Sequence, residues 1–377
     1  MVEVQDIFRL YGPKYIETNF LRPNQLKAMY DIMNCRSPVL GGHADICDEC
    51  GFIHVSYNSC RNRHCPKCQT LAKEKWIESR RYDLLNVGYF HVVFTLPAEL
   101  GPIAYQNQKA VYNILFKAAS ETLMELAADK RHLGAKIGIT SILHTWGQNL
   151  HFHPHIHCVV PGGGLNSCNQ WVESRKNFFI PVKVLSRKFR GKFLYFLRQA
   201  NLSFHGSIAE YDNPHLFDRF TLSLKHKEWV VYCKPPFANA SKVIDYLGRY
   251  THRVAISNNR ILKLENGMVT FLWRDYRDGN KQKTMTLTAN EFIRRFLMHI
   301  LPRRFTKIRH YGLLSPRTKA LKLDLCKKLT NSPTIAKPTT KLSPLELLKS
   351  LTGIDYSLCP RCGVGHLTRA SPVSLIA

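Results

Sequence analysis

The sequence is poor in acidic residues, and it contains no long apolar run. Asp and Glu number 27 against 54 Lys and Arg in 377 residues, which gives a formal net charge of +27. Because Lys and Arg neutralise phosphates and release their condensed counterions, this excess predicts a polyanionic partner and favours nucleic acid. No window approaches the roughly 20 apolar residues of a membrane span, and residues 1–6 lack the apolar core of a signal peptide. We expect a cytoplasmic protein that does not bind membranes.

A phosphate-binding loop of the type Gly-x-x-x-x-Gly-Lys is also missing from the sequence. The glycine run at 162–164 follows a strand-like segment, but no Lys completes the motif, so the run indicates a turn. The chain therefore shows no sign of this kind of nucleotide site.

The composition is nevertheless that of a folded protein. Apolar residues make up 45% of the chain and aromatic residues 11%, enough to bury the cores of two or three domains. Residues 20–34 have helical spacing opened by Pro23, and they run into a stretch rich in Cys, Gly and Asn. This pattern predicts a small metal-held module over residues 1–78, from which a helix at 69–86 leads onward.

The middle of the chain, residues 79–312, mixes short β-branched and aromatic runs with longer segments of helical spacing. Strands are expected at 90–96, 137–143, 156–160, 229–232 and 268–273. Helices are expected at 103–130, 185–201, 239–250 and 289–301. We therefore predict an α+β fold in which helices pack on one antiparallel sheet.

Residues 313–377 are expected to form a basic C-terminal extension. From residue 303 to 349 there are 12 Lys or Arg and only two acidic residues, and four prolines interrupt any helix. We predict that this region packs poorly.

Two Cys-x-x-Cys pairs stand close together in the N-terminal module: Cys47 with Cys50, and Cys65 with Cys68. In a reducing compartment such pairs indicate metal ligation rather than disulfides. Four thiolates form the tetrahedral set that zinc prefers. We predict one structural zinc ion on these four cysteines, in a module that also recognises DNA, because Arg and Lys interleave with the ligands.

Further metal ligands are possible in two places. Three candidates lie among the four cysteines and can complete a second site or replace a thiolate: His43, Cys60 and His64. Near the C-terminus, Cys359 and Cys362 look like half of a zinc ribbon, and their partners would be His366, Cys326 or another chain. Spacing alone leaves these alternatives open.

Four histidines occupy every second position from His151 to His157. Alternate residues of a strand face the same side, so His155 and His157, on either side of Ile156, can bind one cation together. A metallo-hydrolase of the His-x-His-x-Asp-His type would need acidic and histidine ligands directly after this pair. Cys158 and Val159 follow instead, which excludes that class.

A histidine-apolar-histidine strand preceded by a polar ligand is the signature of the HUH endonucleases, which nick single-stranded DNA. The third ligand is expected about one short hairpin upstream, where His144 can turn to face His155 and His157. Gln148 would add a hard oxygen ligand suited to Mg²⁺ or Mn²⁺, and His151 is a third contender. We prefer His144, then Gln148.

Tyr246 and Tyr250 are spaced i and i+4, which puts them on the same face of a helix. Alone, such a pair usually indicates core packing. Beside an HUH pair it indicates nucleophiles, because that chemistry needs a hydroxyl on a helix over the metal, and two hydroxyls allow successive cleavage and strand transfer.

Together these motifs resemble the rolling-circle transposases of bacterial insertion-sequence family 91, the two-tyrosine HUH class with an N-terminal zinc-binding domain. The matching stretches are 59–68, 144–165 and 246–257, in the same order, and the resemblance covers most of residues 20–315.

The resemblance implies that Tyr246 or Tyr250 attacks a backbone phosphorus, keeps the 5′ end as a phosphotyrosine and leaves a 3′-OH for host replication to extend. Mg²⁺ or Mn²⁺ on the histidines would polarise the phosphate, and Arg249 and Arg253 would contact DNA phosphates. The expected partners are single-stranded DNA at the element ends and target, and the host replication machinery. The alternatives are a relaxase or rolling-circle replication initiator, and a zinc-dependent DNA-binding protein without catalysis.

Overall fold

A five-stranded antiparallel sheet forms the centre of one of the two compact units of the chain. The computed structural model describes residues 2–175, 179–237, 243, 248, 254–276, 278–333 and 343–370. One unit comprises Arg80–Thr251 and Leu301–Ile335, and the other comprises Met1–Ser79, His252–Ile300 and Ala336–Ala377.

The five strands of the first unit are ordered β12-β4-β5-β3-β8, and every neighbouring pair is antiparallel. Their bounds are Tyr89–Thr95 (β3), Gly138–Trp146 (β4), Phe152–Pro161 (β5), Val231–Phe237 (β8) and Ile308–Gly312 (β12). β4 is buried along its whole length, as expected for a central strand rich in Ile, Leu and Thr. The predicted antiparallel α+β architecture is confirmed, but the strand expected at 268–273 pairs in a separate sheet and not in this one.

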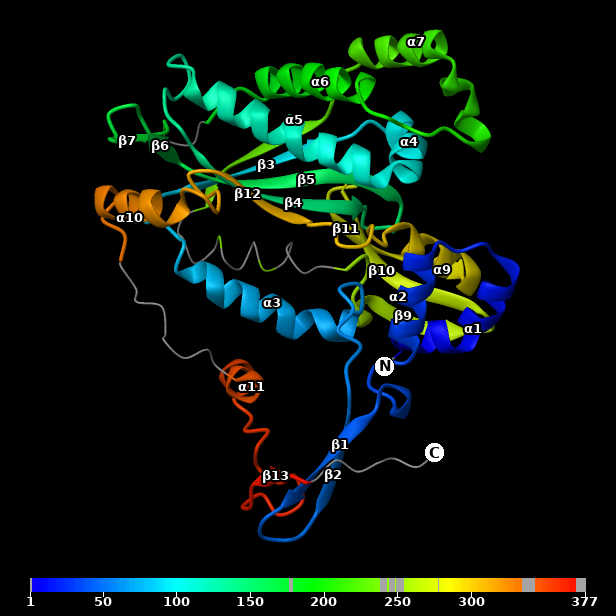
Figure 1. Ribbon diagram of the computed structural model, residues 1–377. Coiled ribbons are helices and arrows are strands. Elements are labelled where there is room, and N and C mark those ends of the chain that lie inside the picture. Colours follow the sequence, from blue (N-terminus) through cyan, green and yellow to red (C-terminus); the bar gives the residue numbers. More distant parts are fainter. Residues whose placement is uncertain are drawn as a thin grey trace. The chain divides into compact units, whose positions relative to one another are not determined.

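Helices cover one face of this sheet (Figure 1). They are α4 (Gly101–Gln106), α5 (Gln108–Ala128), α6 (Val182–Arg198) and α7 (Pro214–Lys225). Phe189 of α6 packs its ring 4.8 Å from that of Phe94 on β3 and 5.5 Å from that of Trp229. The apolar face of the sheet is therefore sealed by aromatic side chains from the helical layer.

Part of the basic C-terminal region is well packed, which corrects the expectation of a loose extension from residue 303 onward. β12 pairs with β4 along five residues, and α10 (Lys319–Leu329) buries Leu323 and Cys326 in a cluster with Leu85, Leu165 and Leu313. The cations did not prevent packing because long basic side chains also cover apolar surface. The Arg309 guanidinium, for example, lies 4.2 Å from the centre of the Phe116 ring.

The second unit contains a helical layer on a small sheet. The helices are α1 (Val4–Thr18), α2 (Pro23–Met33) and α9 (Ala289–Met298), and the strands, ordered β11-β10-β9, are Ile261–Glu265 (β9), Met268–Asp275 (β10) and Lys281–Thr288 (β11). Phe8 of α1 meets Phe296 of α9 edge to face at 5.1 Å. The Gln25 amide donates to the Leu297 carbonyl oxygen at 2.9 Å, so segments distant in sequence share one core.

This unit also holds a three-stranded ribbon in which a strand near the C-terminal end of the described residues pairs with a hairpin from the N-terminal region. Its order is β13-β1-β2, with β1 at Gly42–Cys47, β2 at Ile53–Tyr57 and β13 at Leu367–Arg369. Two further helices belong to the flanking segments, α3 (Pro66–Arg81) and α11 (Pro344–Thr352). The compact units differ from the three consecutive domains expected at 1–78, 79–312 and 313–377, because residues 252–300 group with the N-terminal module and β13 pairs with β1.

Across the described part of the chain, no helix has both the length and the apolar character needed to cross a membrane.

We predict that Phe189→Ala destabilises the first unit by about 3–5 kcal/mol, because it opens a cavity under fully buried aromatic rings. A urea titration followed by tryptophan fluorescence measures the change. The matched control is Tyr195→Ala on the same helix, where the side chain is 59% exposed; it should change the free energy of unfolding by less than about 0.5 kcal/mol. Equal effects of the two substitutions would contradict the packing described.

Candidate metal centres and active site

Three histidines converge on one face of the five-stranded sheet. In the pairing of β4 with β5, His144 lies directly opposite His155, and Ile142 lies opposite His157. His155 and His157 flank Ile156, which turns to the opposite face and joins the hydrophobic core. One ring nitrogen from each of the three histidines lies within 4.8 Å of the others. The structure therefore brings His144 to the two histidines that it was predicted to face.

Hydrogen bonds determine which ring nitrogen carries the proton in two of these histidines. The Nδ1 atom of His155 lies 2.7 Å from the carbonyl oxygen of His153. A carbonyl only accepts, so Nδ1 carries the proton, and Nε2 of the neutral ring keeps a lone pair for a cation. His157 Nδ1 lies 2.8 Å from His91 Nε2. When His157 donates through Nδ1, its Nε2 is likewise left to bind.

His91 on β3 is a member of the site that the sequence analysis missed. It is 3% exposed, and its ring is nearly parallel to that of His157 with 5.1 Å between centres, so the two hydrogen-bonded rings lie side by side. Burial, with a smaller effect of Lys234, lowers the pKa of His91 to about 3, so the ring is neutral and can accept the His157 proton. In the sequence, His91 is recognisable only as a polar residue within the apolar run at 89–95. That it pairs with His157 follows only from the β3–β5 register.

The remaining predicted ligands lie nearby in the hairpin. Gln148 is half-buried in the turn that joins β4 to β5, and His151 is exposed just before β5. His153 is exposed, with its ring centre 5.3 Å from that of His155. Of the candidates for third ligand, His144 is the one grouped with His155 and His157.

The predicted nucleophiles lie outside the described residues. Tyr246 and Tyr250 fall there, as do the predicted phosphate contacts Arg249 and Arg253. Their roles stay predictions from the sequence.

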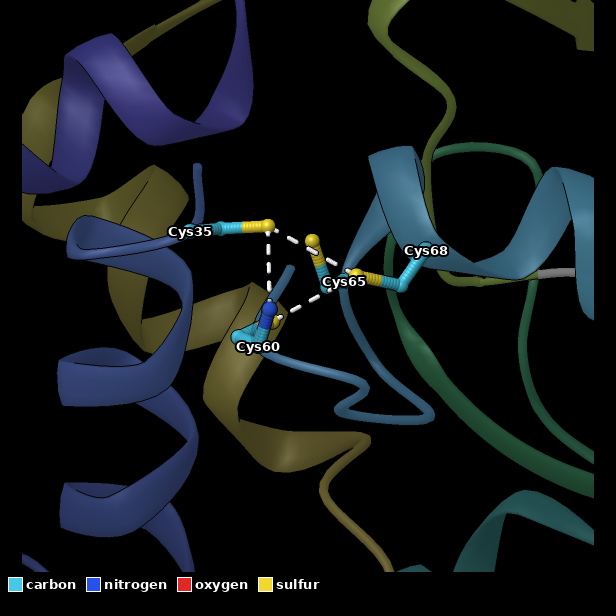
Figure 2. Close-up of side chains that lie close together, drawn as sticks. All are labelled: Cys35, Cys60, Cys65 and Cys68. Carbon is cyan, nitrogen blue, oxygen red and sulfur yellow. Dashed lines mark hydrogen bonds between the residues drawn. The ribbon is translucent and has the colours of Figure 1, made fainter. Parts of the chain in front are cut away.

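Four cysteine side chains of the second unit point toward one another (Figure 2). Cys35 follows α2, Cys60 follows β2, and Cys65 and Cys68 lie at the start of α3; their sulfur atoms are all within 4.8 Å of one another. The Cys68 Sγ is 3.5 Å from that of Cys35 and 3.6 Å from that of Cys60. A Zn–S bond of about 2.3 Å puts the sulfurs of a tetrahedral site about 3.8 Å apart, so this set has the dimensions of a zinc site.

The grouping of Cys47 and Cys50 with Cys65 and Cys68 is corrected by the structure. Cys47 and Cys50 lie instead with Cys359 and Cys362, with all four sulfurs within 4.8 Å. The reason is the β1–β2 hairpin. Its base holds Cys35 and Cys60, its tip holds the Cys47 pair, and the five residues of β2 separate the two ends by about 17 Å at 3.3 Å per residue.

Sequence reasoning therefore found one possible ligand and missed another. Cys60, named as a possible ligand, belongs to the first cysteine set, whereas Cys35 was overlooked although it directly follows a predicted helix. His43 and His64 belong to neither cysteine set: His43 lies 3.5 Å from Asp45, and the His64 amide donates to the Asn62 side chain.

Known proteins similar to this chain cover nearly all of it. Residues 138–322 match the family described as "Putative transposase", and residues 7–96 match the family described as "Transposase zinc-binding domain". The "Putative transposase y4qJ" of Sinorhizobium fredii is 49% identical over 374 residues, 97% of this chain and 94% of that protein. The "Transposase for insertion sequence element IS801" of Pseudomonas savastanoi pv. phaseolicola is 29% identical over 354 residues, 92% of this chain and 84% of that protein.

The two family matches include the first cysteine set and the three histidines. A zinc-binding domain is matched where the first cysteine set lies, which supports a structural zinc ion. The transposase match begins at β4 and contains the three histidines. The chain belongs to the insertion-sequence transposases of family 91 and carries their N-terminal zinc-binding domain.

Proposed function

We propose that this transposase cuts and rejoins single-stranded DNA through a tyrosine nucleophile beside a histidine-bound divalent cation, in rolling-circle transposition. The observation that carries the proposal is the convergence of His144, His155 and His157 on one face of the sheet. Three imidazoles lie together there, and one of them is hydrogen-bonded to a fourth, buried imidazole. Metal binding accounts for such a grouping, since metal-binding histidines are commonly oriented by a hydrogen bond from their other ring nitrogen. The net charge of +27 suits a DNA substrate.

The donor set fits a divalent cation. The His155–His153 hydrogen bond puts the proton of the His155 ring on Nδ1, and the His91–His157 bond orients a second ring. Three nitrogen ligands would leave part of the coordination shell of Mg²⁺ or Mn²⁺ to water, a phosphate oxygen or the Gln148 amide oxygen. When bound, the cation supplies polarisation and positioning of the scissile phosphate.

In the proposed reaction, the hydroxyl of Tyr246 or Tyr250 attacks the phosphorus. A tyrosine O–P bond forms, the P–O3′ bond breaks, and the phenol proton ends on the released 3′ oxygen. A free tyrosine has a pKa near 10, so the phenol proton must leave as the O–P bond forms. The phosphotyrosine keeps the energy of the broken bond, so a 3′-OH of a second end can reverse the step without a nucleotide cofactor. Arg249 and Arg253 are proposed to offset the phosphate charge.

For the zinc-binding domain, we propose Cys35, Cys60, Cys65 and Cys68 as the ligands of its structural zinc. The Cys68 Sγ lies 3.5 Å from Cys35 Sγ and 3.6 Å from Cys60 Sγ, and all four sulfurs lie within 4.8 Å of one another, which supports this set. The ion would hold α2, the base of the β1–β2 hairpin and α3 together, which suits a module that recognises DNA.

We predict that the purified protein, mixed with labelled single-stranded oligonucleotides carrying its element ends and Mg²⁺ or Mn²⁺, forms a protein–DNA adduct that survives denaturation. Tyr246→Phe and Tyr250→Phe together should abolish the adduct, because no phenol remains to attack. The single variants should each retain part of the reaction and show which tyrosine acts first. An adduct that persists in the double variant would overturn the proposal, and the absence of any adduct would favour DNA binding without catalysis.

We predict that His91→Gln lowers metal affinity or activity by roughly 10–100-fold, the usual cost of removing a group that orients a metal ligand. The loss should appear mainly as a higher Mn²⁺ concentration for half-maximal nicking, because the three ligands remain. His153→Gln is the matched control: it is exposed on the same face of the sheet, and its carbonyl still accepts from His155. Equal effects of the two substitutions would contradict the assigned role of His91.

A further inference from the structure

A second four-cysteine set, formed by Cys47, Cys50, Cys359 and Cys362, joins the β1–β2 hairpin to the C-terminal segment. We propose that it binds its own zinc ion, so that each chain carries two. The zinc-binding family match ends at residue 96, far before Cys359. The proposed site belongs wholly to the second unit, and it does not depend on the proposed nuclease chemistry.

The sulfur geometry suits a tetrahedral ion. Cys47 Sγ is 3.7 Å from Cys362 Sγ, and Cys50 Sγ is 3.7 Å from Cys359 Sγ. These distances match the roughly 3.8 Å edge of a zinc tetrathiolate. They far exceed the roughly 2.05 Å of a disulfide, and all four cysteines are free thiols.

The two halves of the site have the same local structure. Each is a Cys-x-x-Cys-Gly turn whose glycine, Gly51 or Gly363, has φ near +66° or +70° and donates its amide to the carbonyl of the first cysteine. Backbone amides also point at the sulfurs: Cys50 N lies 3.5 Å from Cys47 Sγ, and Gly365 N lies 3.4 Å from Cys362 Sγ. These amides donate to sulfur atoms that would bind the ion.

Contacts other than the metal hold the halves in register. β13 pairs with β1 from Leu367 opposite Cys47 to Arg369 opposite Asp45. The Asp48 amide donates to the His366 carbonyl at 3.1 Å, and the His366 amide donates back to the Asp48 carboxylate at 2.7 Å. A Cβ on Gly365 would lie 2.5 Å from Cys47 Sγ, so only glycine allows this close approach.

The ion would cross-link two segments that are more than 300 residues apart in sequence. Ordering so long a loop costs chain entropy, and a three-residue strand such as β13 offsets little of it. Metal binding adds its free energy to that of folding as the four thiols release their protons to the solvent. We therefore expect the C-terminal segment to form part of the folded N-terminal ribbon.

The zinc content of the full-length protein, measured by plasma mass spectrometry, tests the proposal. We expect two zinc ions per chain in the wild type, one in Cys359→Ser/Cys362→Ser and one in Cys60→Ser/Cys68→Ser. The matched control, Cys168→Ser/Cys233→Ser, changes cysteines outside both sets and should keep two. A wild-type chain with a single zinc that Cys359→Ser/Cys362→Ser retains would overturn the second site and leave the first intact.

Alkylation of the unaltered protein gives a second test that needs no folded variant. Cys50 and Cys168 are both exposed, so access alone predicts similar reaction with iodoacetamide. Ligation predicts that in the zinc-loaded protein Cys168 is alkylated while Cys50 and Cys362 are protected until a chelator removes the metal. Alkylation of Cys50 as fast as Cys168 in protein that still holds zinc at the first set would refute the proposal.

Discussion

The register of β4 against β5 is the constraint on which the candidate active site depends. It sets His144 opposite His155 and leaves His157 on the same face, while Ile156 between them is buried in the core. A slip of one residue would turn the histidines into the aromatic core and expose the isoleucine, so burial enforces the register. β3 pairs with β5 on its other edge and brings His91 to His157. Hydrophobic packing on one face thus positions the polar chemistry of the other.

The β1–β2 hairpin determines how the cysteines are grouped. Its strands separate two clusters of sulfur atoms, one at the base and one at the tip, and neither cluster is complete within the hairpin. The base needs Cys65 and Cys68 of α3, and the tip needs Cys359 and Cys362 from the other end of the chain. A ribbon this small has little core of its own, since Ile53 and Val55 of β2 remain largely exposed. Metal ligation is a common way to stabilise such a module.

Much of the larger unit could be predicted from the sequence because its signals are local. The strands at 89–95, 138–146 and 152–161 are dense in β-branched and aromatic residues, and the alternation of His155 and His157 follows from strand geometry alone. Packing of the basic residues after 303 could not be predicted, because β12 is short and carries Arg309 and His310 among its five residues. Only pairing with β4 makes it a strand.

The sequence by itself determined which chemistries were available: cysteine pairs suited to zinc, a histidine strand suited to a divalent cation, two tyrosines spaced by one helical turn, and a strong positive charge. These depend on residue type and short spacing. Tertiary structure decided which groups act together. It groups Cys47 and Cys50 with a cysteine pair some 300 residues away, and it adds Cys35 to the first cysteine set and His91 to the histidine site. Such choices depend on strand register and on the length of a hairpin, which bring distant residues together through contacts that no local pattern encodes.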